Sequence, residues 1–448
     1  MLSVQEAEAR CASLVEAARK AGADAADAVY IGDGSTGVQV RLGALEDVER
    51  SEGEEIGLRL FVGRRSASVS SSDLSHDALL GLVERAAAMA REAPEDPYAG
   101  LAPEERLLRG AAPDIAGDDG ADPAPTELKA RALGMEEVAR GFPGITNSEG
   151  ASVSAGRSVT ALATSHGFCR GYSTSGYSAS VSVLGGSGSD MQRDHASHSV
   201  RHYADLDGPE ALGRLAAERT LARLNPGKLA SGAMPVLFDP RVGASLVGHL
   251  LGAITGAAIA RKTSFLLGRE GELVFPEDIT ISDDPHRPRG MRSKPFDGEG
   301  LATAPRNLIE RGRLTGWLMD SASARQLGLE PTGHATRGSG GSPGAGATNV
   351  DLLAGAVSRA ELMADIRRGL LVTELIGQGV NPVTGDYSRG ASGFIIENGE
   401  LAGPVAEITI AGNLTTMFQN LVAANDLEQR RAVNVPTLRV EGMIVAGA

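Results

Sequence analysis

The stretch DPRVGASLVGHLLGAITGAAIA, residues Asp239–Ala260, says most about how this chain folds. Asp239 is a residue type that commonly precedes a helix, because its side chain can accept a hydrogen bond from a free backbone N–H. Pro240 suits the first helical position, where its missing N–H needs no partner. The residues that follow are apolar on nearly every side, so the pattern predicts one buried helix over residues 240–260.

Three glycines mark one side of this predicted helix. Gly248, Gly252 and Gly256 recur every four residues and form a stripe without side chains. Each glycine inside a helix costs about 1 kcal/mol relative to alanine, so the stripe predicts that another backbone packs closely against it. We interpret His249, beside the stripe, as a core or cleft histidine with satisfied hydrogen bonds, because one ligand cannot make a metal site.

The sequence around this helix is rich in strand patterns. Alternating apolar residues bounded by glycine and charged turns predict strands at 234–238, 271–275, 278–282, 405–412 and 437–445. Two hairpins are predicted, one over 308–319 and one that turns at Glu397-Asn398-Gly399. A helix is expected near 414–424 and a glycine-rich loop over 333–346. Residues 229–448 therefore form, in our prediction, a β-rich domain, barrel- or sandwich-like, around the buried helix.

The first half alternates helices with strands. Ser3 and Glu6 form a capping-box pattern before a helix that extends to about Lys20. Residues 29–70 indicate several short strands, 79–90 an amphipathic helix, and 93–125 a linker rich in Pro, Asp and Gly. We predict an N-terminal helix–strand domain (1–110) and a middle α+β segment (111–228). The whole chain is then an α+β protein whose N-terminal α/β half combines helices with antiparallel strands.

Composition excludes several classes of protein. The chain has 448 residues, of which 42% are hydrophobic and 22% charged, so it is not an intrinsically disordered protein. Its formal net charge of −14 repels nucleic acid and anionic membranes. Cys11 and Cys169 lie far apart and form no CxxC pair. The opening MLSVQEAEAR has no apolar signal region, so we expect a cytoplasmic protein that binds neither nucleic acid nor a membrane.

Two short motifs match catalytic or cofactor patterns only in their letters. Gly32–Gly37 fits GxGxxG, but the residues that follow alternate like a strand instead of starting a helix, so we interpret it as a hairpin loop. Gly340–Gly344 fits GxSxG, but no strand precedes it and no helix follows, which favours a flexible loop over a hydrolase nucleophile.

One group of histidines needs weighing as a metal site. His195, His198 and His202 would share a face if their segment were helical, and three imidazoles can hold zinc. The segment alternates like a strand, however, and in a strand His195 faces away from the other two. A solvated strand face is the favoured interpretation, and a metal site at these histidines is the weaker alternative.

Several longer stretches carry a resemblance to a known family. From residue 230 to the end the chain is similar to the TldD/PmbA proteins, in their PmbA (TldE) branch, and the order of helices and strands before residue 230 is compatible with it. The stretches that carry the resemblance are GAITGAAIARKTSFL, DITISDDP, FDGEG, LIERGRLTGWLMD, GATNVDLLAG, LLVTELIGQGVNPVTGDYSRGASGFIIENGE, PVAEITIAGNL and VPTLRVEGMIVAG.

This resemblance implies a division of labour between two kinds of subunit. TldD-type members are zinc metallopeptidases with an HExxxH motif on the matching helix and a cysteine ligand near the C-terminus. In this chain the two histidine positions and the glutamate position fall on Val247, Gly252 and Gly248, and no cysteine occurs around 422–426. Zinc peptidases need about three protein ligands and a carboxylate that activates water. We therefore expect no zinc and no peptidase activity in this chain alone.

The resemblance then suggests a non-catalytic subunit of a cytoplasmic TldD/TldE-type metalloprotease. It would pair with a TldD-like chain that holds the zinc, and would help to enclose or present peptides or unfolded segments, including precursors that mature by proteolysis. Two alternatives stay open. The first is an autonomous metallopeptidase that uses an unrecognised site, such as the three histidines with Asp205. The second is a homodimeric peptide-binding or scaffold protein.

Polar residues in the glycine-rich loops are candidates to line a substrate cleft, because exposed polar residues of loops often bind ligands. Turn chemistry in GVNPVTGDYSRG is the competing and favoured explanation for the Asn and Asp residues. With His249, the candidates are Arg337, Asn349, Asn381, Asp386, Ser388 and Arg389.

Overall fold

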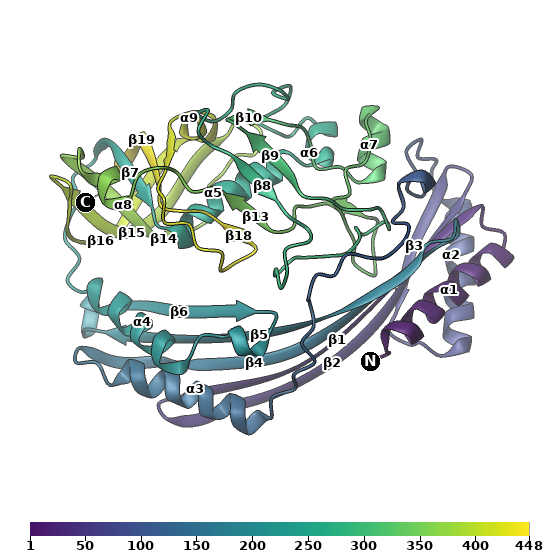
Figure 1. Cartoon of the computed structure of the whole chain (residues 1–448), viewed down its shortest axis with the longest axis horizontal. Coiled ribbons are helices and arrows are strands. Elements are labelled where there is room, and N and C mark those ends of the chain that lie inside the picture. Colours follow the sequence, from purple (N-terminus) through teal and green to yellow (C-terminus); the bar gives the residue numbers. More distant parts are fainter. Residues whose placement is uncertain (448) are drawn as a thin grey trace.

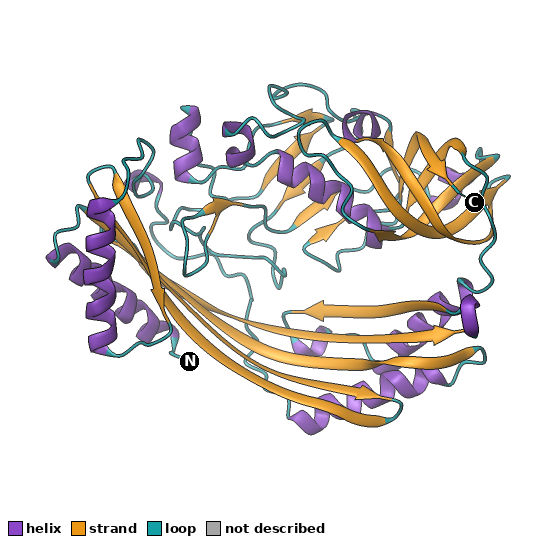
Figure 2. Ribbon diagram, turned by 180° about the vertical axis from the view of Figure 1, so that it is seen from behind, coloured by secondary structure: helices purple, strands orange, loops and turns teal. Residues whose placement is uncertain are grey.

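The protein consists of a strongly curved sheet with helices on it and a C-terminal part that lies across the hollow of the sheet (Figure 1). The structure is a computed structural model that describes residues 1–447. Figure 2 shows the same arrangement from behind, with the helices of the first half next to the sheet and a mixture of strands, loops and short helices in the second half. The predicted α+β fold class is confirmed.

The curved sheet has six antiparallel strands. Its order, β3-β2-β1-β4-β5-β6, places β1 and β4 side by side, although about a hundred residues separate them in the sequence. The segments predicted as an N-terminal domain and a middle segment therefore share one continuous sheet. Its strands are β3 (Arg65–Ser71), β2 (Ala44–Val62), β1 (Ala25–Arg41), β4 (Ile145–Thr164), β5 (Cys169–Gly185) and β6 (Gln192–Val200).

The strands are much longer than the sequence pattern predicted. Gly32–Gly37, interpreted above as a hairpin loop, lies inside β1 and is paired on both sides, with 49–54 of β2 and 154–159 of β4. The prediction was wrong because backbone hydrogen bonds to two neighbouring strands outweigh the weak local preference of Gly, Asp and Ser for turns. The rejection of a dinucleotide-binding loop is unaffected, since no helix follows Gly37.

Four helices cover one face of this sheet. Alternate residues of β1, among them Ala28, Tyr30 and Val38, point to that face and are buried under the helices. Val29, between them, points to the opposite face and packs with Phe296 and other residues of the C-terminal part. The helices are α1 (Val4–Lys20), α2 (His76–Glu92), α3 (Pro125–Arg140) and α4 (Pro209–Ala222).

The predicted linker is fixed against the C-terminal part of the chain. Between α2 and α3 its only regular element in the structure is a short 3-10 turn, Glu104–Arg106. Leu107 is buried and forms a β-bridge with Leu301. The guanidinium of Arg325 donates hydrogen bonds to the carbonyl groups of Tyr98, Gly100 and Leu101 at 2.8–2.9 Å.

The C-terminal part is built around a sheet that closes on itself. Five strands form a ring because β16 pairs with β19 as well as with β15. Of the two predicted forms, barrel-like and sandwich-like, this closure is the barrel-like one. The strands are β16 (Glu400–Asn413), β15 (Asp386–Glu397), β14 (Arg368–Ile376), β7 (Gly232–Phe238) and β19 (Leu438–Ala446), with β17 (Leu421–Ala423) also paired to β19.

Smaller elements surround this ring. A five-stranded sheet contains β10 (Arg313–Leu314), β9 (Arg306–Glu310), β8 (Ile281–Asp283), β13 (Val350–Leu352) and β18 (Val433–Asn434), and β11 (Ala335–Thr336) pairs with β12 (Gly344–Ala345). The helices are α5 (Pro240–Ala253), α6 (Gly256–Ala260), α7 (Ser321–Leu327), α8 (Arg359–Met363) and α9 (Leu414–Gln419).

Both predicted hairpins are confirmed, and two other C-terminal predictions were wrong. Asn398 and Gly399 have φ of 52° and 85°, which joins β15 to β16 by a two-residue turn. The helix expected near 414–424 ends at Gln419 because the next residues pair with β19 as β17. The strand expected at 271–275 is reduced to one bridge between Leu273 and Arg313.

A buried group of charges joins the curved sheet to the C-terminal part. Asp27 of β1 forms ion pairs with Arg59 of β2 and with Arg337, and Arg59 also lies 3.8 Å from Glu299. All four side chains are at most 6% exposed. Burial acts to raise the pKa of Asp27, but the charges of Arg337 and Arg59 outweigh burial and hold that pKa below its usual value.

Among residues 1–447, no helix combines the length and the apolar character needed to cross a membrane.

Replacing Asp27 should destabilise the fold strongly. In Asp27→Ala the guanidinium groups of Arg59 and Arg337 stay buried without this carboxylate, which costs about 3–5 kcal/mol of unfolding free energy. Urea unfolding measures the loss. Glu52→Ala is the control, because Glu52 pairs with Arg50 on the surface, and it should change stability little. Equal losses of stability in the two variants would contradict the stabilising role of Asp27 in the buried charge group.

Candidate functional site

The helix that contains Val247, Gly248 and Gly252 is shorter than predicted. The Asp239 side chain accepts a hydrogen bond from the backbone N–H of Arg241 at 3.1 Å, as expected of an N-cap. The helix ends at Ala253 because Ile254 and Gly256 exchange backbone hydrogen bonds with Leu318, which pulls the chain into an extended link. A second short helix, α6, then begins. The single helix predicted over 240–260 is therefore two helices.

The glycine stripe does not have the close backbone neighbour that we predicted. Gly248 and Gly252 are exposed, and a Cβ built on either would meet no atom of residues 1–447 within 4 Å. Only Gly256 is tightly packed, since its Cβ would lie 2.4 Å from Ser323 Oγ and 2.5 Å from Met319 Sδ. The first two glycines thus leave open space along α5, and only the third allows close packing.

The three positions that we matched above to a zinc motif carry no side chain that can bind a metal. Val247 is 2% exposed and belongs to the C-terminal core, and the glycines have no side chains. Both cysteines lie in the first half of the chain, Cys11 in α1 and Cys169 at the start of β5. Within the described residues, no group of three His, Cys, Asp or Glu side chains is placed to hold a metal ion.

His249 and Arg389 are brought together around a buried tyrosine. The rings of His249 and Tyr387 lie 6.0 Å apart between centroids, and Tyr387 is 1% exposed. Burial, and next the charge of Arg389, lowers the pKa of His249, while burial raises the pKa of Tyr387 to about 12. In the described part of the chain His249 Nε2, Tyr387 Oη and Arg389 Nε are buried without hydrogen-bond partners. His249 is thus not the satisfied histidine that we predicted.

Three further candidates lie in the loop before β15 and at its start, and two of them shape that loop. Asn381 Oδ1 accepts hydrogen bonds from the backbone N–H groups of Val383 and Thr384. Asp386 accepts hydrogen bonds from Thr384 Oγ1 at 2.7 Å and from Asn413 Nδ2 at 3.2 Å. These contacts are those of turn residues. Ser388 is exposed, and its backbone N–H donates to the carbonyl of Gly379 at 2.7 Å.

Two predicted cleft residues are buried instead. The side chain of Arg337 is 2% exposed and belongs to the buried charge group with Asp27. Asn349 is completely buried and holds neighbouring loops together by hydrogen bonds with the Arg292 backbone N–H, the Asp284 carbonyl and Ser293 Oγ. Both predictions were wrong because a glycine-rich loop is not exposed when another part of the chain packs over it.

The three histidines do not form a group. His195 is exposed on β6, whereas His198 receives a hydrogen bond from the backbone N–H of Asp207 at 3.2 Å. His202 lies beyond the end of β6, and its Nε2 is 2.8 Å from the carbonyl oxygen of Ala116. The strand interpretation of this segment is confirmed up to Val200.

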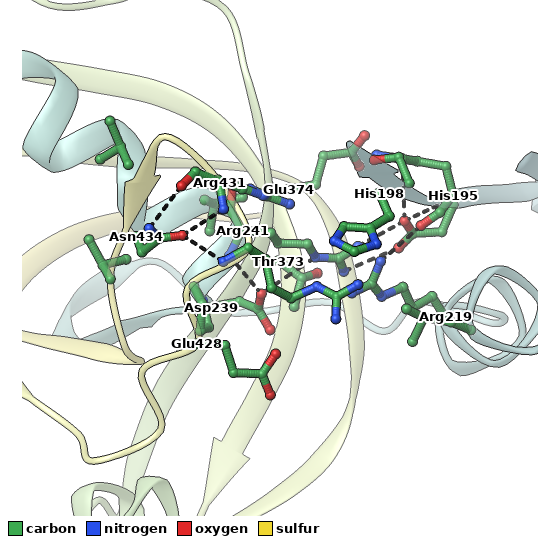
Figure 3. Close-up of a pocket in the computed structure, with 18 of the residues that line it drawn as sticks. His195, His198, Arg219, Asp239, Arg241, Thr373, Glu374, Glu428, Arg431 and Asn434 are labelled. Carbon is green, nitrogen blue, oxygen red and sulfur yellow. Dashed lines mark hydrogen bonds and ion pairs between the residues drawn. The ribbon is translucent and has the colours of Figure 1, made fainter. Parts of the chain in front are cut away.

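A cleft of about 900 Å³ lies between the middle segment and the C-terminal part. Figure 3 shows His195, His198 and Arg219 on one side of it and Asp239, Arg431 and Asn434 on the other, with Arg241 and Thr373 between them. The sides come from β6 and α4, and from α5, β14 and residues 426–435.

Asp194 ties the two sides of this cleft together. It is 4% exposed and accepts hydrogen bonds from Arg241 at 2.9 and 3.2 Å, while Arg223 lies 3.5 Å away. Burial acts to raise the pKa of Asp194, but Arg241, the backbone N–H of His195 and Arg223 together hold it below the usual value.

The cleft carries an excess of arginine. Four of its arginines form ion pairs with carboxylates: Arg193 with Glu149, Arg223 with Glu374, Arg241 with Asp194 and Arg430 with Asp207. Within residues 1–447 four others have no carboxylate within 4 Å: Arg219, Arg292, Arg359 and Arg431. Sequence reasoning missed this set because its members come from separate elements. The adjacent Arg430 and Arg431 are the only local signal.

Both the sequence and the fold of this chain have known relatives. Three domain families match in order: PmbA/TldA metallopeptidase domain 1 over residues 26–90, the central domain over 118–224 and the C-terminal domain over 231–447. Metalloprotease PmbA of Escherichia coli O157:H7 is 40% identical over 417 residues, which cover 92% of this chain and 90% of that protein. The chain belongs to the PmbA/TldD family, in its PmbA branch.

Solved structures share the fold of this chain. A Bacteroides thetaiotaomicron protein named as a proposed modulator of DNA gyrase superposes with a TM-score of 0.92 at 27% identity and covers all of both chains. TldE from Thermococcus kodakarensis has the same fold, with a TM-score of 0.86 at 23% identity. The match covers 97% of this chain and 99% of the TldE chain.

Replacing each of the three glycines by alanine should change the unfolding free energy in opposite directions, depending on whether the new methyl group meets open space or a packed neighbour. Gly248→Ala and Gly252→Ala should each raise the unfolding free energy by up to about 1 kcal/mol, because alanine favours the helix and its methyl group meets no neighbour. Gly256→Ala should lower it by about 1–3 kcal/mol, because the methyl group collides with Ser323 and Met319. Urea unfolding of the three variants tests this, and a loss at Gly248 or Gly252 as large as at Gly256 would contradict it.

Asp194 should contribute stability that depends on pH. At pH 7, Asp194→Ala should lower the unfolding free energy by about 3–5 kcal/mol, because the buried Arg223 and Arg241 each lose one of their two carboxylate partners. A carboxyl with a lowered folded-state pKa stabilises fully above its unfolded pKa of about 3.9 and loses that contribution as pH falls through the folded value. The difference between wild type and variant should therefore shrink at acidic pH.

Asp205→Ala is the matched control for this measurement. Asp205 pairs with Arg289, and both side chains are about half exposed (42% and 50%). A surface pair of this kind contributes about 0–1 kcal/mol. A loss in Asp194→Ala that matches the control, or that does not change with pH, would contradict the role of Asp194.

Proposed function

We propose that this protein is the non-catalytic subunit of a TldD/TldE-type metalloprotease in the cytoplasm. It pairs with a TldD-like chain that holds the zinc, and it helps to enclose and present peptides or unfolded segments for cleavage. The observation that carries the proposal is the state of α5. Val247, Gly248 and Gly252 replace the two histidines and the glutamate that a zinc peptidase of this family needs, and the two glycines face open space.

Other observations support this role. The relative from Escherichia coli is named a metalloprotease, and the relative of the same fold from Thermococcus kodakarensis is named TldE. A complete loss of ligands and of the general base leaves no group that could activate water at this position. The C-terminal core around α5 is nevertheless intact, which fits a fold retained for binding.

A second candidate, an autonomous metallopeptidase at the three histidines, finds less support. His195, His198 and His202 point to different partners, and carbonyl and backbone groups already occupy two of them. A homodimeric peptide-binding protein is a further candidate, which the experiment below also distinguishes.

The test mixes this chain, purified without an affinity tag, with an HExxxH-bearing relative from the same organism. We expect a stable mixed complex by size-exclusion chromatography with light scattering. We also expect faster cleavage of an unfolded protein than either chain gives alone, and loss of that cleavage with a chelator. Metal analysis of this chain alone should find no stoichiometric zinc.

A partner whose motif glutamate is replaced by glutamine provides the control, since the mixed complex should then form without cleaving. Absence of a mixed complex, or chelator-sensitive cleavage by this chain alone, would overturn the proposal. A homodimer that ignores the partner would favour the scaffold alternative.

A further inference from the structure

The arginine-rich cleft is an unusual feature in a chain with a net charge of −14. Arg219, Arg241 and Arg431 lie close enough to influence one another. Burial, and next the charge of Arg241, lowers the pKa of Arg219. Arg219 and Arg431 donate only to backbone carbonyl groups in the described chain, those of His195 and Arg241, at 3.0 Å. Their charge is therefore not neutralised by a carboxylate within ion-pair distance.

One buried polar group at the centre of the cleft also lacks a partner. Thr373 is 6% exposed, and its hydroxyl makes no hydrogen bond within residues 1–447. Thr373 lies at a β-bulge, where the pairing of β14 with β15 shifts between Val372 and Glu374. Bulges redirect side chains near binding sites, and Thr373 lies in the wall of the cleft (Figure 3). Unpaired buried polar groups are costly, and a ligand can satisfy them.

The composition of the walls indicates which anions fit. Asp239, Asp426 and Glu428 also line the cleft, and the structure shows no arginine bound to Glu428. A compact polyanion such as a triphosphate would be repelled by these carboxylates. An extended chain with separate single negative charges can place each one at a guanidinium, while its backbone amides meet the Glu428 carboxylate. Guanidinium groups bind carboxylates in a bidentate way, and the volume suits a small ligand or a short segment.

We propose that this cleft binds a peptide segment that carries Asp or Glu side chains. The four arginines of the cleft without a carboxylate of residues 1–447 within 4 Å pair with its carboxylates, and the Thr373 hydroxyl binds a peptide carbonyl. These arginines are Arg219, Arg292, Arg359 and Arg431. The inference rests on the proposed peptide-handling function and specifies the class of segment that this chain selects. The cleft that would select the segment is lined by Arg241, in the first turn of α5, and by the strands and loops around it. It is separate from the open face of α5 at Gly248 and Gly252.

The test uses the isolated full-length chain and two rhodamine-labelled, end-blocked peptides, a Gly–Glu repeat and its Gly–Gln counterpart. Fluorescence anisotropy should show that the Glu peptide binds about ten-fold more tightly or better, because charge-assisted hydrogen bonds form only with carboxylates. The combined change Arg219→Gln and Arg431→Gln should weaken binding of the Glu peptide about ten-fold. Thr373→Val should weaken both peptides alike.

Arg85→Gln is the matched control, because it removes an exposed arginine of α2 outside the cleft, and it should leave binding unchanged. Arg292→Gln with Arg359→Gln is a second variant. These side chains make no hydrogen bond in the described structure, so the variant should keep the wild-type unfolding midpoint while it weakens binding.

Three results would overturn the proposal: equal binding of the Glu and Gln peptides, wild-type affinity in both double variants, or inorganic triphosphate binding more tightly than the Glu peptide at the same arginines. Because the binding is measured without a partner, these results are distinct from failure to form the mixed complex. If the chain forms the mixed complex but does not prefer the Glu peptide, the proposed subunit role stands and the proposed selection of acidic segments is wrong.

Discussion

The antiparallel pairing of β1 with β4 is the constraint on which the other parts of the structure depend. It joins 27–40 to 151–164 in one ladder and so makes a single curved sheet from two segments of the chain. Every other strand of that sheet is placed by a neighbour in sequence. Once the sheet exists, one face is available for four helices and the other for the C-terminal part. Without this pairing, β6 would have no fixed position opposite α5.

Charged contacts then fix how the sheet and the C-terminal part meet. Asp27 near one end of the sheet and Asp194 on β6 are both buried acceptors for arginines, and each binds a residue from the C-terminal part. A buried ion pair adds little net stability compared with apolar packing, but an unpaired buried charge is strongly unfavourable. Such contacts therefore select one docking arrangement. The same arrangement leaves other arginines of the cleft without carboxylates.

The exposed side of α5 carries glycines where side chains could otherwise stand. At α5 the two glycines, Gly248 and Gly252, leave open space, whereas Val247 is packed in the core. Nearby His249, Tyr387 and Arg389 retain buried polar atoms without partners. A bound ligand or water can satisfy such groups. Together with the cleft, they give this chain surfaces suited to holding a ligand.

Local patterns in the sequence were sufficient to predict those features whose conformation depends only on nearby residues. Asn398 and Gly399 adopt positive φ cheaply, so the hairpin was predictable, and Asp239 with Pro240 correctly marked the start of α5. Arg337 shows the opposite case, because its loop is buried by a strand some three hundred residues earlier. The length of β1, the end of α5 at Ala253 and the clustering of Arg219, Arg241 and Arg431 likewise follow from contacts between distant segments. Residue types and short spacings define local conformations and chemical capacity, whereas burial and proximity arise when separate elements pack, and no short pattern encodes them.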